Sequence, residues 1–392
     1  MYKFFIAVLL LPLLINAQTD DIVKGNTEFA LNLYQQLSKN NPEKNLFFSP
    51  FSISQIMAIT YAGTRKNTEK QIQKVFHFPN DNKQLHSSFA LLNKQLKSNT
   101  DAVTLETANS LWIQNDYAFK TEYFDLVTKN YNALLKNVNF KKKRKRKDII
   151  KDINSWVADN TNNNIKQLIT EKDISKYTKL VLVNAIWFYG EWQTTFDEKK
   201  TKEAIFYTPS VKQKAPFMQQ TRDFLYYSDD IVQAVKIPYK KNKQSMLILL
   251  PQQNNIKTLE KNLDIDYLNL INNETREYNV NIIIPKFTVD YSVRLKQTLQ
   301  QMGMTDAFSN TADFSGLTDK NDLKIDKVIH KAKFEITEKG ASAAAATAVT
   351  IIRKTAVIKT VTFNANHPFI YFIIDNKTKT VLFMGRLCSV DG

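Results

Sequence analysis

The chain has 392 residues and an ordinary globular composition, with 43% hydrophobic residues, 25 phenylalanines, eight glycines and ten prolines. This content can fill a sizeable core, and it excludes a fibrous, disordered or small loop-rich protein. Because no linker-like stretch divides the chain, we expect a single domain. The formal net charge is +16, and its distribution is uneven because one run is strongly basic.

The first residues have the pattern of a secretory signal peptide. One lysine precedes the apolar run 4–14, and the small residue Ala17 stands where a signal peptidase could cut. We therefore expect residues 1–17 to be removed, which leaves residues 18–392 as the mature, extracellular protein. No other stretch approaches the about 20 apolar residues that a membrane anchor needs.

Secretion gives meaning to two further features. Cys388 is the only cysteine, so no internal disulfide can form and the core must supply the stability. No catalytic pattern accompanies this thiol, and we interpret it as a small buried apolar residue. Asn273 and Asn376 each begin an Asn-X-Thr pattern, which is an acceptor for glycosylation on a secreted chain.

Two segments in the first half have helical patterns. Residues 27–38 carry apolar side chains at helical spacing, which predicts an amphipathic helix. Pro50 opens a second, mostly apolar segment that ends at Gly63, in keeping with the preference for proline at the start of a helix and glycine past its end. Residues 103–111 approach a period of two, and residues 180–187 are nearly all apolar, as in a central strand covered on both faces.

The second half is rich in short segments that are typical of strands. An amphipathic helix over residues 291–302 is predicted to interrupt them. The predicted strands are residues 246–250, 280–284, 328–336, 357–363, 369–374 and 381–387. Helices mainly in the first half and antiparallel sheets in the second indicate an α+β fold around one core.

The stretch 338–352 (EKGASAAAATAVTII) lies between two predicted strands and carries no charge after Lys339. Alanine favours helix, so a surface helix or a flexible linker is one interpretation. At a period of two the same residues form a small-to-apolar face, as in a strand buried in a sheet. The cations Arg353 and Lys354 follow directly. The segment is therefore suited either to exposure in solvent or to insertion into a sheet as a strand.

Seven consecutive basic residues form the basic run, which consists of Lys141, Lys142, Lys143, Arg144, Lys145, Arg146 and Lys147. It lies between a predicted strand (134–140) and a predicted helix (149–156). Adjacent like charges repel, and they gain stability beside an anionic polymer, where counterion release makes binding salt-dependent. A heparin-like glycosaminoglycan or polyphosphate site is one interpretation, and a solvated loop without a ligand is the other. The predicted secretion disfavours a nuclear signal.

At five places the sequence resembles the serpin family. Residues 47–54 (FFSPFSIS) resemble its shutter segment, residues 184–192 (NAIWFYGEW) its breach strand, and residues 329–332 (IHKA) the strand that leads to its hinge. Residues 367–372 (HPFIYF) and 382–386 (LFMGR) resemble the signature near the carboxyl end, in the expected order.

The resemblance covers nearly all of residues 26–392 and implies a single serpin domain over residues 18–392. Its fold would have three mostly antiparallel sheets, about nine helices and an exposed reactive-centre loop at about residues 338–363. In this family, polar groups under the main sheet control its opening, so Ser49 and Ser52 are expected to satisfy buried backbone groups, not to act as nucleophiles. The residues implied for the shutter and breach are Ser49, Ser52, Asn184, Trp192 and His330.

The stretch 338–352 resembles the proximal hinge of inhibitory serpins, where small residues let the loop enter the main sheet after cleavage. The residues implied for the hinge are Glu338, Gly340, Ala341, Ala343, Ala344, Ala345, Ala346 and Thr347. The family usually has Thr or Ser where this chain has Ala341, and often Glu where it has Ser342. Both residues are small and uncharged, so insertion is still expected. An inserted segment of about 15 residues would span roughly 50 Å as a hydrogen-bonded strand, and this step drives the mechanism.

Serpin spacing, counted forward from Gly340 and back from Phe363, places the scissile bond between Lys354 and Thr355. Arg353 offers a competing cut one residue earlier. Lysine suits a primary pocket that carries a carboxylate, as in trypsin-like proteases. The implied mechanism is suicide inhibition: the protease serine attacks the carbonyl of Lys354, an acyl-enzyme forms, and insertion of the loop drags the protease away before the ester is hydrolysed.

The predicted function is therefore a secreted inhibitor of a trypsin-like serine protease, acting as a monomer in a setting such as a coagulation or immune cascade. It is not predicted to be an enzyme, and no G-x-S-x-G pattern supports a hydrolase. The alternative is a non-inhibitory serpin that acts as a carrier or a polyanion-binding protein, and the small hinge residues favour inhibition. His330 lies outside any ligand spacing, so no metal is expected. We also expect no cofactor, nucleic acid or membrane partner, and a heparin-like glycosaminoglycan is the only ligand that the basic run suggests.

Overall fold

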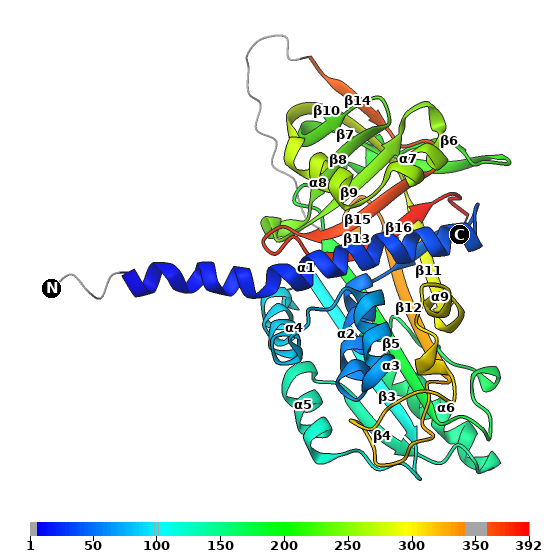
Figure 1. Cartoon of the computed structure of the whole chain (residues 1–392). Helices are drawn as coiled ribbons and strands as arrows, with labels where there is room; N and C mark the ends of the chain where they lie inside the picture. Colours follow the sequence, from blue (N-terminus) through cyan, green and yellow to red (C-terminus); the bar gives the residue numbers. More distant parts are fainter. Residues whose placement is uncertain (1–5, 98, 101, 342–358, 392) are drawn as a thin grey trace.

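A computed structural model of the chain describes residues 6–97, 99–100, 102–341 and 359–391. Its described part contains nine α-helices and two large sheets, which confirms the α+β fold. The nine-stranded sheet lies at the top of Figure 1 and the seven-stranded sheet extends below it, with helix α1 crossing where they meet. None of the helices in the described part is long and apolar enough to cross a membrane.

The nine-stranded sheet forms the upper layer. Its strands in spatial order are β1 (Leu46–Phe48), β16 (Val381–Leu387), β15 (Phe369–Asp375), β9 (Gln244–Pro251), β8 (Val232–Pro238), β7 (Lys212–Ser228), β10 (Arg276–Pro285) and β14 (Val361–Asn364), with β6 (Lys202–Tyr207) beside β7. Three sheets were expected, whereas the described part of the chain forms two, because strands expected in two separate sheets belong to this one. Strand β7 pairs with β6 over residues 212–217, with β10 over residues 217–226 and with β8 over residues 225–228.

The seven-stranded sheet carries the region of interest. Its strands in order are β11 (Phe287–Arg294), β12 (Lys327–Ile336), β5 (Leu180–Glu191), β3 (Val103–Gln114) and β2 (Asn99–Thr100), with β13 (Gly340–Ala341) beside β5 and β4 (Leu134–Val138) beside β3. Strand β5 is central and buried along nearly its whole length, as its apolar sequence predicts. Most pairs are antiparallel, but β5 and β12 are parallel neighbours.

The helices lie mainly in the first half, as predicted. They are α1 (Ile6–Asn40), α2 (Pro50–Ala62), α3 (Lys66–Phe76), α4 (Asn82–Leu96), α5 (Thr121–Tyr131), α6 (Lys143–Asp159), α7 (Ile256–Asn262), α8 (Ile265–Glu274) and α9 (Lys296–Gln301). Helix α2 begins after Ser49, whose hydroxyl accepts the N–H of Ser52, and ends at Gly63. The expected helix over 27–38 is part of α1.

One element was predicted wrongly. The predicted helix 291–302 is instead the end of strand β11 followed by the short helix α9 (Lys296–Gln301). Buried and exposed side chains alternate along β11 from Phe287, and the sheet pairs it with β12. A pattern that is examined only from Tyr291 onward misses this alternation.

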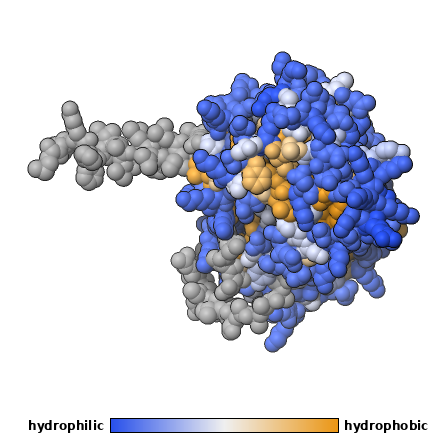
Figure 2. Space-filling model, turned by 90° about the horizontal axis from the view of Figure 1, so that it is seen from below, coloured by the Kyte–Doolittle hydropathy of each residue, from blue (hydrophilic) through white to orange (hydrophobic). Residues whose placement is uncertain are grey.

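The two faces of the seven-stranded sheet are covered by different helices. Helix α2 packs on one face in the main core, together with Leu180 and Leu182 of β5. Helix α6 covers the other face, where Ile153 and Val157 join Val183 of β5 in a second cluster. The molecule seen from below is mostly hydrophilic, with apolar residues gathered near the middle of that face (Figure 2).

Candidate functional site at the seam between β5 and β12

The candidate site is the seam between the parallel strands β5 and β12. Their register runs from Val181 opposite Lys327 to Trp187 opposite Lys333. Above this register, β13 (Gly340–Ala341) pairs antiparallel with Glu191 and Gly190 at the end of β5. Strand β13 therefore lies at the upper end of the seam and runs antiparallel to β5.

Glu338 anchors the start of the hinge. Only 6% of this residue is exposed, and its carboxylate lies 2.9 Å from Nζ of Lys286 and accepts the hydroxyl of Thr201 at 2.8 Å. Burial alone raises the pKa of Glu338, but the bonds from Lys286, Thr201 and the backbone outweigh it and hold the pKa below its ordinary value. The predicted hinge therefore begins with a charged residue whose carboxylate is paired and hydrogen-bonded.

Gly340 is required by the geometry of the hinge. Its φ is +130°, and a Cβ at this position would lie 2.1 Å from the carbonyl oxygen of Gly190 and 2.6 Å from Cα of Glu191. Both neighbours are backbone atoms, so a side chain has no room unless β13 moves away from β5.

Trp192 closes the top of the seam. Its ring stacks on Tyr239 with centroids 4.6 Å apart, and its Nε1 donates to the carbonyl of Thr337 at 3.0 Å. The backbone N–H of Trp192 donates to the carbonyl of Lys339 at 3.0 Å. The predicted breach residue thus contacts the hinge directly, and it lies apart from the other four predicted polar residues.

Those four residues, Ser49, Ser52, Asn184 and His330, form one buried network under the seam. The backbone N–H of Ser49 donates to Nε2 of His330 at 3.2 Å, so Nδ1 carries the proton and donates to Oδ1 of Asn184 at 2.5 Å. Nδ2 of Asn184 donates to the hydroxyl of Ser52 at 2.5 Å. Burial lowers the pKa of His330 to about 3, so the imidazole is neutral at physiological pH.

This network crosses the line along which the sheet would open. Asn184 and His330 are direct partners in the register of β5 and β12, so a strand that entered between them would break their bond. Sequence reasoning missed two members of the network, Asn109 and Gln55, which continue it beyond Asn184. Each is an ordinary polar residue in its own segment, so the sequence held no signal for this role.

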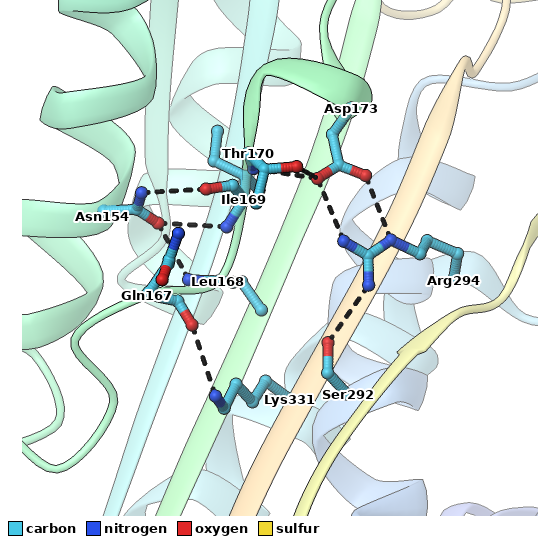
Figure 3. A network of polar contacts seen from close by, with 9 residues as sticks. All are labelled: Asn154, Gln167, Leu168, Ile169, Thr170, Asp173, Ser292, Arg294 and Lys331. Atoms are coloured by element: carbon cyan, nitrogen blue, oxygen red, sulfur yellow. Dashed lines mark hydrogen bonds and ion pairs between the residues drawn. The ribbon is translucent and has the colours of Figure 1, made fainter.

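A strap crosses the opposite face of the seam (Figure 3). We define it as residues 160–173, which follow α6. Asn154 of α6 fixes it, because its Nδ2 donates to the carbonyl of Ile169 at 3.0 Å and its Oδ1 accepts two successive backbone N–H groups. Lys331 of β12 donates to the carbonyl of Gln167 at 3.3 Å. The strap is therefore attached both to α6 and to β12.

The strap ends in a bidentate ion pair with β11 (Figure 3). Nε and Nη2 of Arg294 each lie 3.0 Å from a carboxylate oxygen of Asp173, which also accepts the N–H of Thr170. The side chain of Asp173 is 5% exposed. Burial alone raises its pKa, but the bonds from Arg294 and Thr170 outweigh it and lower the pKa below its ordinary value. Strands β11 and β12 cannot move away from β5 without straining this pair.

The basic run begins α6, whereas the sequence placed it in a segment before the helix. Six of its residues are exposed, and the exception is Arg146, which is half-buried and donates to the carbonyl of Phe140 at 3.0 Å. The ion pairs of the run join Lys141 to Asp116, Lys145 to Asp148 and Lys147 to Glu171. Among the residues that the structure describes, Lys142, Lys143 and Arg144 have no ion pair.

Several predicted site residues lie outside the described part of the chain. These are the bond Lys354–Thr355, the alternative Arg353 and the hinge residues Ala343, Ala344, Ala345, Ala346 and Thr347. Cys388 is buried, and burial raises the pKa of its thiol to about 11. No cluster of three or more metal-ligating side chains occurs within the described residues.

The two glycosylation acceptors differ in their surroundings. Asn273 is exposed at the end of α8. Asn376 instead uses its Nδ2 to donate to the carbonyl of Asn242 at 2.9 Å and to the hydroxyl of Ser245 at 2.8 Å. Asn376 thus uses in hydrogen bonds the nitrogen to which a glycan would attach, whereas Asn273 is exposed.

Comparison with known proteins identifies the family. Residues 24–390 match the family described as serpin (serine protease inhibitor). The chain is 37% identical over 393 residues to human Serpin B3 (94% of this chain, all of the relative) and 36% identical over 381 residues to human leukocyte elastase inhibitor (94% and 100%). The structure of human thyroxine-binding globulin superposes with a TM-score of 0.87 at 26% identity, over 95% of this chain and 99% of that one. The chain belongs to the serpin family, whose members are typically protease inhibitors, not enzymes.

Proposed function

We propose that the chain inhibits a trypsin-like serine protease, which cuts after Lys354 and is trapped when the cut loop inserts between β5 and β12. The register of β13 carries this proposal. Continued down β5 without a shift, it brings Ile351 opposite Leu180, the first residue of that strand. Lys354 would then lie beyond the lower end of β5, about 45 Å from the hinge at ~3.4 Å per residue.

The side chains of the loop suit this register. Directly opposite residues of an antiparallel pair point to the same face. Val349 and Ile351 would therefore join Leu182 and Leu180 in the main core. The other face would carry mostly small residues, namely Ser342, Ala344, Ala346, Ala348 and Thr350, under α6 and the strap. The larger side chains would thus enter the core, and the small ones would pass beneath the helix.

Insertion must separate β5 from β12, and the described contacts oppose it on both faces. The bond between His330 and Asn184 crosses the seam on one face, and Asp173 and Arg294 tie β11 to the strap on the other. A new strand would compensate by hydrogen-bonding along both β5 and β12. The closed sheet is therefore held until cleavage frees the loop to supply that strand.

The predicted leader, residues 1–17, supports action outside the cell, and the cation at Lys354 supports a protease with a carboxylate in its primary pocket. One relative is named leukocyte elastase inhibitor, and the matching family is described as serine protease inhibitor, which supports the reaction class. Surfaces outside the loop also select a partner, so the cation at Lys354 indicates the class of protease and not the individual enzyme.

Incubation of residues 18–392 with trypsin tests this proposal. We expect a complex that survives denaturing electrophoresis, and a released carboxyl-terminal peptide that begins at Thr355 by mass spectrometry. A peptide that begins at Lys354 would move the bait to Arg353. The variant Ala345→Glu, which places a charge opposite Ile186 in the core, should still be cut but should form no complex. Clean cleavage of the unmodified protein without a complex refutes trapping and supports a non-inhibitory carrier.

A second proposed function is polyanion binding by the basic run. No acidic residue stands in the first turn of α6, although the amino end of a helix favours negative charge. Three exposed cations, Lys142, Lys143 and Arg144, have no ion pair within the described residues. Cations that lie side by side at the amino end of a helix repel one another and the helix dipole, and an anionic polymer such as heparin or polyphosphate would reduce this repulsion.

Affinity for immobilised heparin at several salt concentrations tests this second proposal. The substitution of Lys142, Lys143 and Arg144 by Gln should lower the affinity and flatten its salt dependence. The matched control substitutes by Gln three other exposed lysines without an ion pair among the described residues, Lys70 and Lys74 of α3 and Lys83 of α4, and it should have little effect. Equal losses in both triple variants would mean that only the net charge matters, which refutes a defined site.

A further inference from the structure

Strand β7 has a free edge in the middle of the nine-stranded sheet. Strand β10 pairs with β7 along one side without a break. On the other side the register of β6 ends at Phe217 and that of β8 begins at Leu225. Within the described residues, the edge over residues 218–224 therefore has no strand beside it. Alternate residues of an antiparallel strand direct their N–H and C=O groups away from the paired side, so this edge presents hydrogen-bonding groups.

A cleft occupies the place of the missing strand. Its volume is about 1050 Å³, and it is lined by residues 219–224 of β7, by the loop 193–200 that precedes β6, by Asn279 of β10, and by Ile237, Pro238 and Lys339. The loop and the end of β8 thus border the uncovered edge on either side. The cleft is long enough for a segment of about five extended residues, or roughly 17 Å.

Gln220 is a buried amide without a partner in this cleft. Only 8% of the residue is exposed, and among the described residues neither its Oε1 nor its Nε2 has a hydrogen-bond partner. Leaving both atoms of a buried amide unsatisfied is unfavourable. A carboxamide can donate to and accept from a peptide group at the same time, so a peptide main chain in the cleft would satisfy both atoms.

Arg222 indicates the charge of such a peptide. It lies two residues beyond Gln220 on the same face of β7, it is exposed, and within the described residues it has no ion pair. Lys199, Lys200 and Lys339 also line the cleft, together with Asp197, Glu198 and Asp223, so the lining carries four cations and three carboxylates. An acidic residue opposite Arg222 would form the favourable cross-strand pair that the chain itself does not supply.

We propose that this cleft binds an extended acidic peptide of a partner protein as an added β-strand, at the uncovered edge of β7 beside Gln220 and Arg222. Main-chain hydrogen bonds along residues 218–224 and the amide of Gln220 hold the peptide, and Arg222 selects an acidic side chain. The cleft borders the hinge at Lys339, but no residue of β5 or β12 lines it.

Fluorescence anisotropy with two labelled peptides tests the proposal on residues 18–392. The first probe is acetyl-Thr-Val-Glu-Val-Thr-amide, and the second has Lys in place of Glu. We expect the acidic probe to bind at least tenfold more tightly. Arg222→Glu should reverse this preference, whereas Lys214→Glu makes the same charge change on β7 outside the cleft and should leave it intact.

Gln220→Met separates binding from folding. The variant replaces an unsatisfied amide by an apolar side chain of similar size, so its melting temperature should be equal or higher, while the affinity for the acidic probe falls at least tenfold. Absence of binding to the unmodified protein at millimolar probe, or binding that neither Gln220→Met nor Arg222→Glu changes, would overturn the proposal. Binding that appears only after trypsin has cut the loop would also overturn it, because the chain's own loop would then be the occupant.

Discussion

Substitution of Gly340 by alanine tests the geometry of the hinge most directly. The new Cβ would lie 2.1 Å from the carbonyl oxygen of Gly190, where an ordinary contact is 3.4 Å or more. Because the neighbouring atoms belong to the backbone of β5, no rotamer relieves the contact. We expect β13 to separate from β5 and the start of the loop to leave the top of the seam.

The loss of stability expected for Gly340→Ala has two contributions. A non-glycine residue at φ +130° is strained by about 1–3 kcal/mol. Separation of β13 adds the loss of one or two backbone hydrogen bonds, each about 0.5–1.5 kcal/mol. The free energy of unfolding of Gly340→Ala should therefore fall by about 1.5–6 kcal/mol, and more of the protein should be cut by trypsin without forming a complex.

Gly303 provides a matched control. Its φ is +110°, and nothing lies within 4 Å of the Cβ that alanine would add. Gly303→Ala therefore carries only the conformational strain, about 1–3 kcal/mol. Chemical denaturation and the stoichiometry of trypsin inhibition are measured for both variants. Equal losses of stability, with unchanged inhibition by Gly340→Ala, would refute the importance of the contact with β5.

Three further predictions concern the strap, the network under the seam and the glycan. Arg294→Met leaves the buried carboxylate of Asp173 without its cation, so the free energy of unfolding at pH 7 should fall by about 1–3 kcal/mol. Because the pKa of Asp173 is lowered in the folded protein, the difference between the variant and the unmodified protein should shrink in denaturation curves as the pH falls below about 4. A difference that stays constant with pH would contradict this role of the ion pair. Burial holds the pKa of His330 near 3, so neutral His330 supports stability that is lost between about pH 6.5 and 3. His330→Gln should flatten the stability profile in that window, and an equally steep profile would exclude His330 as its source. In a secreted preparation, peptide mapping should find the glycan on Asn273 and not on Asn376, and the reverse occupancy would be inconsistent with the fold.

The local signals in the sequence predicted the elements whose boundaries are set by the chain itself. Pro50 and Gly63 mark the two ends of α2 because proline and glycine act on the backbone where they stand. The apolar run 180–187 identified the central strand β5 because burial on both faces leaves no polar position. The error at 291–302 arose where a strand and a short helix adjoin, since a window across the boundary mixes the two periods.

The sequence by itself determined the family, the candidate bait residue Lys354 and the small residues of the hinge, because each depends on residue type and spacing along the chain. Only the tertiary structure decided which distant groups act together. The pair Asp173 and Arg294 spans 121 positions, and Asn184 and His330 span 146. Contacts at such separations depend on the order of strands in a sheet, which local pattern does not specify, and so does the uncovered edge of β7.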